Sequence, residues 1–102
     1  MQKKKIAVIF GGNSTEYEVS LQSSYSVFEN IDKEKYDVFP IGITRSGEWY
    51  HYTGDIKKIA DNTWFTDKEK MSSIVVSQNR SVKGFIEFKE EKFYIIKVDL
   101  IF

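Results

Sequence analysis

Residues 6–23, IAVIFGGNSTEYEVSLQS, join a continuous apolar run to a polar segment through two adjacent glycines. Short apolar runs bounded by turn residues, like residues 6–10 here, are typical of strands buried on both faces of a parallel sheet. Thr15 is followed three residues later by Glu18, a capping-box pattern in which the hydroxyl and the carboxylate each bond a free backbone N–H. The stretch therefore predicts a strand, a tight turn and the start of a helix.

Apolar residues continue at helical spacing after this start. They are Leu21, Tyr25 and Phe28, flanked by Val27 and Ile31. A stripe of this kind predicts a helix that packs one face against the rest of the protein. The charged run at residues 32–35 is expected to end the helix and turn the chain.

Residues 36–43, YDVFPIGI, predict a second strand. Pro40 cannot donate a hydrogen bond to a ladder, so this strand is expected to be bulged or to lie near an edge. Strand, helix and strand in this order make a βαβ unit. The chain is therefore expected to have an α/β fold.

The middle of the chain changes character. Turn residues flank three aromatic side chains, Trp49, Tyr50 and Tyr52. Core packing or a subunit contact is expected of them rather than base stacking, because no basic groove accompanies them. Residues 55–61 predict a short helix, whereas residues 62–72 are polar and show little pattern.

The last third of the chain reads as strands. Residues 74–76 predict a short strand, and residues 83–99 predict a hairpin that turns at Glu90 and Glu91. Residues 98–102, VDLIF, resemble a further buried strand. Since ligands of open α/β sheets bind beyond the carboxyl ends of the strands, a chain that stops there is expected to be a fragment of a larger protein.

Composition excludes several classes of function. The 102 residues have room for one domain, and 15 basic and 15 acidic side chains give zero formal charge. Neither nucleic acid nor an anionic membrane is expected as a partner, because such binding needs excess positive charge. With no cysteine and with His51 as the single histidine, no metal site is expected, and His51 is predicted to be an exposed or packed hairpin residue. The basic start precedes too few apolar residues for a signal peptide, so a cytoplasmic protein is expected.

The glycine turn has two chemical interpretations. A helix N-terminus can bind phosphate, but GGNSTE matches neither common phosphate-loop pattern, and Glu16 and Glu18 would repel a phosphate. A carboxylate at that position is favoured in its ionised form and suits an ammonium ligand such as that of an amino acid. Capping accounts for Glu18, which leaves Glu16 as the candidate for binding, with a purely structural role as the alternative.

The opening stretch resembles that of a known family. KKIAVIFGGNSTEYEVSLQS (residues 4–23) is similar to the start of the D-alanine–D-alanine ligases, ATP-grasp enzymes of peptidoglycan synthesis. The residues that match the family pattern are Gly11, Gly12, Ser14, Glu16, Glu18, Val19 and Ser20. Residues 33–50 and 98–102 resemble later parts of the same N-terminal domain. Tyr17 departs from the usual His or Arg, which bears on local packing.

The resemblance implies a fold and a set of roles. The fold would be a Rossmann-like (pre-ATP-grasp) parallel sheet with flanking helices and an added β-hairpin. Glu16 would be the catalytic and substrate-binding residue that holds the ammonium of the first D-alanine, and Val19 would line the same pocket. General similarity over residues 41–83 most resembles the VanG-like D-alanine–D-serine ligases of vancomycin-resistant bacteria.

The resemblance also implies a mechanism and partners. ATP would phosphorylate the first D-amino acid, and the amino group of the second, D-serine or D-alanine, would attack the acyl phosphate. ATP and Mg²⁺ would bind to ATP-grasp domains outside residues 1–102, so this piece alone would be inactive and would bind no cofactor or metal. The remaining domains of the ligase and a second subunit in a homodimer are the expected protein partners. The rival interpretation is a non-catalytic α/β module for small-ligand binding or interaction.

Overall fold

A computed structural model describes residues 3–13, 15–76 and 84–102. Within these residues one sheet of seven strands is accompanied by two α-helices and two short 3₁₀ helices. In chain order the elements are β1 (Lys4–Gly11), α1 (Tyr17–Asn30), β2 (Tyr36–Ile43), β3 (Trp49–Tyr52), α2 (Lys57–Ala60), the 3₁₀ helices η1 (Trp64–Thr66) and η2 (Lys68–Lys70), β4 (Met71–Val76), β5 (Gly84–Lys89), β6 (Lys92–Lys97) and β7 (Leu100–Ile101).

The sheet is mixed, with strand order β6-β5-β4-β3-β2-β1-β7. β1 is parallel to both β2 and β7, and every other pair is antiparallel. The predicted α/β class and the β1–α1–β2 unit are confirmed. The sheet is not parallel throughout, because short turns such as residues 44–48 cannot make the crossover that parallel neighbours need. The added hairpin, β5–β6, continues the same sheet.

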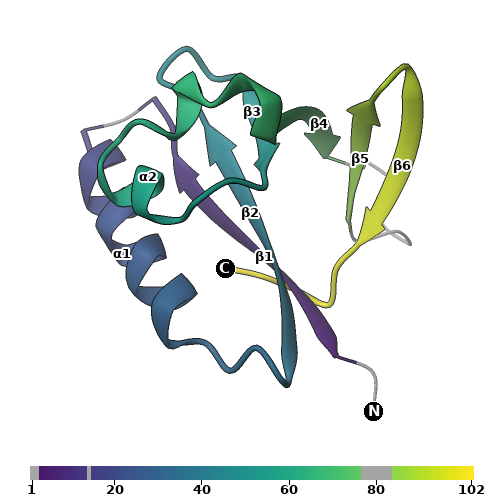
Figure 1. Ribbon diagram of the computed structural model, residues 1–102, viewed down its shortest axis with the longest axis horizontal. Helices are drawn as coiled ribbons and strands as arrows, with labels where there is room; N and C mark the ends of the chain where they lie inside the picture. The colour runs from purple at the N-terminus through teal and green to yellow at the C-terminus, as the bar shows by residue number, and fades with distance from the viewer. Residues whose placement is uncertain (1–2, 14, 77–83) are drawn as a thin grey trace.

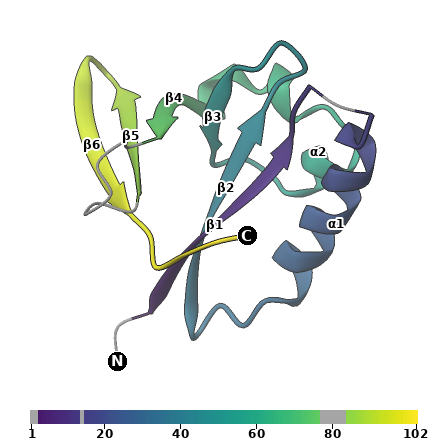
Figure 2. The ribbon, with the colours of Figure 1, turned by 180° about the vertical axis from the view of Figure 1, so that it is seen from behind.

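Both α-helices lie on one side of β1 and β2 in the two opposite views (Figures 1 and 2). The larger core lies between them and the sheet. Its buried members are Ile6, Val8, Phe10, Tyr17, Leu21, Phe28, Tyr52, Ile59 and Trp64. A smaller cluster occupies the other face and includes Ala7 from the middle of β1. Alternate residues of a strand point to opposite faces, so β1 is buried on both sides, as its continuous apolar run predicts.

The predicted capping box is wrong. Helix α1 begins at Tyr17 with Glu16 at the cap position, and no side chain among the described residues caps it. A capping box needs Thr15 at the cap, but the helix starts one residue later, where the Tyr17 ring is buried. This start also sets which residues face inward: Tyr17, Leu21, Ser24 and Phe28 are buried. Tyr25, which was expected in the stripe, is partly exposed.

The segment between β3 and β4 forms the cover of the main core. The predicted short helix is α2, and the patternless stretch that follows contains Trp64, which is completely buried. Its ring meets those of Phe10 and Tyr52 edge-on, with centroids 5.1 and 6.1 Å away. Gly42 is required beneath it, because a Cβ there would lie 2.5 Å from the indole. This segment therefore holds α1 against the sheet.

The strand ends follow the sequence in part. β2 lies inside the sheet between β1 and β3 and pairs with β1 in an unbroken register, so the expectation that this strand is bulged or near an edge is wrong. Pro40 is accommodated because β3 pairs only with residues 41–43, which leaves Pro40 outside that ladder. The hairpin turn is confirmed, since Glu90 and Glu91 have φ of 52° and 66°, typical of a two-residue hairpin turn. The expected burial of residues 98–102 is wrong beyond Val98. β7 pairs with β1 at the edge of the sheet, which leaves its outer side uncovered and its apolar side chains about half exposed.

Candidate ligand-binding turn

The backbone amides of the glycine turn form hydrogen bonds within the protein. The N–H of Gly11 donates to Ser20 Oγ and that of Gly12 donates to the Ile43 carbonyl, both at 2.8 Å. Gly11 has φ of 87°, and a Cβ on it would lie 2.2 Å from the Ile43 oxygen, so glycine is required here. A phosphate loop needs amides that point at the ligand. Because both donors are engaged within the protein, neither glycine amide is available to a phosphate.

The two predicted site residues lie at the start of α1, Glu16 at the cap position and Val19 in the first turn. Both are exposed and they are three residues apart. The turn follows the carboxyl end of β1 directly, which is where α/β sheets place their ligands. Ser14, a further residue of the family pattern, lies outside the described residues.

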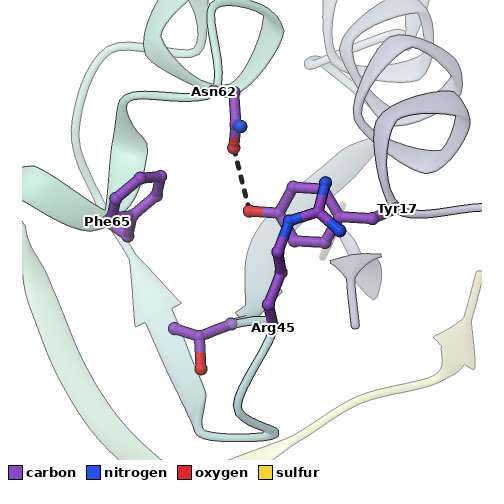
Figure 3. A pocket seen from close by; sticks show the side chains of 5 residues that line it. Tyr17, Arg45, Asn62 and Phe65 are labelled. Carbon is purple, nitrogen blue, oxygen red and sulfur yellow. Dashed lines mark hydrogen bonds between the residues drawn. The ribbon is translucent and has the colours of Figure 1, made fainter. Parts of the chain in front are cut away.

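Behind this turn Tyr17 is inserted into the protein, with 2% of its surface exposed. Its hydroxyl donates to Asn62 Oδ1 at 2.9 Å and accepts a hydrogen bond from Trp64 Nε1 at 3.2 Å. These contacts cross from α1 to the segment after α2, as Figure 3 shows for Tyr17 and Asn62. The sequence linked the departure at Tyr17 to local packing, but it contained no signal for the two partners.

A pocket of about 170 Å³ adjoins the Tyr17 ring. It is lined by Tyr17, Thr44, Arg45, Asn62 and Phe65. Glu16 and Val19 are not among the lining residues, so the predicted site and this pocket are separate features. Sequence reasoning missed the pocket, because its members come from three segments without a common motif.

Arg45 balances part of the negative charge of the turn. Its guanidinium lies 4.2 Å above the Tyr17 ring, and Nη2 is 3.8 Å from Glu18 Oε1. Glu18 is thus engaged with a cation rather than with the helix backbone. Since both charged side chains are mostly exposed, the ion pair contributes little to stability. Its effect is to set the local charge around the exposed turn.

His51 is packed, one of the two predicted outcomes. It lies in β3, and its Nδ1 is 2.6 Å from Glu87 Oε2. Within residues 3–13, 15–76 and 84–102, no group of three His, Cys, Asp or Glu side chains could hold a metal ion. In the same residues no helix is long and apolar enough to cross a membrane.

Comparison with known sequences identifies relatives along the whole chain. The family model of the D-ala D-ala ligase N-terminus matches residues 5–102. A D-alanine–D-alanine ligase of Thermoanaerobacter sp. (strain X514) is 43% identical over 102 residues, which are all of this chain and 28% of that protein. The vancomycin C-type resistance protein VanC1 of Enterococcus gallinarum is 43% identical over 81 residues, which are 79% of this chain and 24% of that protein.

Solved structures of ligases resemble this chain as well. The VanG D-Ala:D-Ser ligase of Enterococcus faecalis superposes with a TM-score of 0.90 at 68% identity, over 98% of this chain and 28% of that one. The D-alanine–D-alanine ligase of Coxiella burnetii has a TM-score of 0.75 at 23% identity, over 99% of this chain and 28% of that one, and shares the fold. The chain thus spans 28% of the length of such relatives. It belongs to the family of D-alanine–D-alanine ligase N-terminal domains.

Proposed function

We propose that residues 1–102 are the N-terminal domain of an ATP-dependent ligase that joins D-alanine to D-serine or D-alanine for peptidoglycan precursors. The observation that carries the proposal is that Glu16 and Val19 are exposed just after the carboxyl end of β1. The chain that carries them belongs to the family of D-alanine–D-alanine ligase N-terminal domains. Glu16 binds the ammonium group of the first D-amino acid, and Val19 contacts the same substrate.

The chemistry of the turn suits that role. A carboxylate at a helix N-terminus is favoured as the anion, and a charge-assisted hydrogen bond to an ammonium is stronger than a neutral one. In a ligation through an acyl phosphate, the first D-amino acid reacts at its carboxylate and the second at its amine. By holding the first amine as an ammonium, Glu16 prevents that amine from acting as a nucleophile and orients the carboxylate at the other end.

ATP and Mg²⁺ supply the activation of the carboxylate, but the described residues do not fit either group. The amides of Gly11 and Gly12 are engaged internally, and no cluster of metal-ligating side chains is present in the part that the structure describes. We therefore assign both to ATP-grasp domains outside this chain. The domain alone is expected to have no ligase activity.

D-Serine is our preferred second substrate. The support is the 68% identity to the VanG D-Ala:D-Ser ligase, together with similarity to a vancomycin resistance protein. We extend the proposal to a homodimeric ligase that acts in the cytoplasm; analytical ultracentrifugation of the full-length protein and fractionation of its host cells test these two points.

The experiment is Glu16→Gln in the full-length protein that contains this chain. The substitution keeps the shape and removes the charge, and the loss of a charged hydrogen bond of about 1.5–3 kcal/mol raises KM for the first D-amino acid by roughly 10- to 100-fold. Glu18→Gln is the matched control, since Glu18 lies on the same helical turn and is paired with Arg45. Unchanged kinetics of Glu16→Gln would contradict the role of Glu16.

A further inference from the structure

We infer that Tyr17 is a positioning residue for Glu16, which it serves through its hydrogen bonds to Asn62 and Trp64. These three residues are called the Tyr17 network below. The inference rests on the proposed function, because it concerns how the carboxylate assigned to the substrate is held in place. Its experiment therefore separates a failure of the network from a failure of Glu16 itself.

The start of α1 needs such support. Among the described residues no side chain caps the helix, and the segment before it follows two glycines with positive φ. Glu16 is joined directly to Tyr17, so fixing the Tyr17 side chain limits where the Glu16 backbone can lie. Ser20 adds a second restraint, since its hydroxyl donates to the Tyr17 carbonyl at 2.7 Å and accepts from the Gly11 amide.

The far end of the network is anchored in the core. Trp64 is completely buried against Phe10 and Tyr52. Asn62 has φ of 59°, which places it in the left-handed region, and its N–H donates to the Ile59 carbonyl at 3.1 Å. The Tyr17 hydroxyl thus joins the first turn of α1 to a segment 45 and 47 residues away that has little freedom to move.

The ring itself is confined as well. A Cβ at Gly11 would lie 3.2 Å from Tyr17 Cε2, so the ring passes close to the glycine turn. The Arg45 guanidinium lies 4.2 Å from the ring centroid (Figure 3). Loss of the hydroxyl leaves these ring contacts in place and removes only the two hydrogen bonds. The expected result is a folded domain whose first turn is less well ordered, and a less ordered carboxylate binds its ligand more weakly.

The test uses Tyr17→Phe and Asn62→Gly in the full-length protein. Glycine keeps the backbone conformation of Asn62 and removes the hydrogen-bond acceptor. Each variant is expected to raise KM for the first D-amino acid about five- to tenfold, the equivalent of one hydrogen bond, with kcat and KM for ATP within about twofold of wild type. Tyr25→Phe is the matched control, because Tyr25 is a partly exposed tyrosine of the same helix; it should leave all constants unchanged.

A double variant tests whether the effect passes through Glu16. In a Glu16→Gln background, Tyr17→Phe should raise this KM no further, since coupled residues are not additive. Full additivity, an unchanged KM in Tyr17→Phe, or an equal loss in every kinetic constant would overturn the inference.

Hydrogen exchange supplies a readout that does not need activity. The Ser20 amide donates to the Glu16 carbonyl at 2.9 Å, so its exchange rate reports on the first turn. Faster exchange of this amide in Tyr17→Phe supports the network, provided that the exchange rate of the Phe28 amide, near the other end of α1, is unchanged. Equal rates in wild type and variant overturn it. If Glu16→Gln is silent while Ser20 exchange accelerates, the proposed function fails and the network stands.

Discussion

His51 Nδ1 lies 2.6 Å from Glu87 Oε2, and this contact connects β3 with β5 across the intervening β4. Both side chains are largely buried, with 13% and 12% of their surfaces exposed. An ionised carboxylate can only accept, so the imidazole donates its Nδ1–H. The pair therefore ties the β5–β6 hairpin to the centre of the sheet with a bond between side chains.

Removal of the acceptor should destabilise the domain. Glu87→Ala leaves a largely buried imidazole N–H without its partner, so the free energy of unfolding should fall by about 1–3 kcal/mol. Glu87→Gln retains a carbonyl acceptor and should lose less. Denaturant unfolding followed by circular dichroism measures both, with exposed Glu69→Ala as the control. Equal losses in the Ala and Gln variants would show that the hydrogen bond is not the cause.

The two glycines of the turn should respond differently to alanine. Gly11→Ala places a Cβ 2.2 Å from the Ile43 carbonyl, and this clash is with backbone, so the domain should lose several kcal/mol or fail to fold. Gly12→Ala meets no described atom within 4 Å and has only its φ of 107° to oppose it. A loss of about 1–3 kcal/mol is expected there. Thermal unfolding of the pair decides, and a Gly12 variant as unstable as the Gly11 one would contradict the steric account.

Alkaline pH should destabilise the fold through Tyr52. Burial, followed by the Asp67 carboxylate, raises the pKa of Tyr52 from its ordinary 10.0 to about 12. Below pH 10 the phenol is protonated in both states and the contribution is constant. Between pH 10 and 12 the unfolded chain loses this proton first, so the free energy of unfolding should fall by on the order of 2 kcal/mol.

Tyr52→Phe isolates that contribution from the other tyrosines. The variant lacks the ionisable group, so its unfolding free energy should decline less steeply above pH 10 than that of wild type. Denaturant titrations at pH 9, 10, 11 and 12 provide the comparison. Parallel curves for the two proteins would rule out Tyr52 as the source.

Glu18→Gln should have almost no effect on stability. A capping role for Glu18 would make this substitution cost stability, but Glu18 contacts the mostly exposed Arg45 at 3.8 Å instead. Such pairs contribute up to about 1 kcal/mol and often less. The melting temperature of the variant should therefore lie within a few degrees of wild type. A large drop would restore the capping role.

Local patterns predicted the elements whose stability is decided locally. The apolar run of β1, the whole of β2 and the turn at Glu90 and Glu91 all follow from neighbouring residues. Trp64 could not be found in this way, because its burial depends on Phe10 and Tyr52, which are distant in sequence. The start of α1 was misplaced for the same reason, since the packing of Tyr17 against residues far along the chain outweighs the capping chemistry of Thr15.

The residues of the candidate site also fall into those that the local sequence predicts and those that only the fold brings together. The family motif predicted Glu16 and Val19, and the structure brings them to one exposed turn. Asn62 and Arg45 carry no motif, and they reach Tyr17 only through the fold. Residues proposed to touch the substrate were thus readable from a contiguous stretch, whereas residues that support them were not.

The engaged amides of Gly11 and Gly12 bear on how a turn of this kind can change during evolution. A loop that grips its ligand with backbone N–H groups keeps that preference whatever its side chains become. Here the amides of Gly11 and Gly12 are committed to holding the turn together, and the exposed side chains of Glu16 and Val19 project beside them. A single substitution at Glu16 or Val19 can therefore change the ligand that the turn prefers. The backbone that presents these side chains need not change.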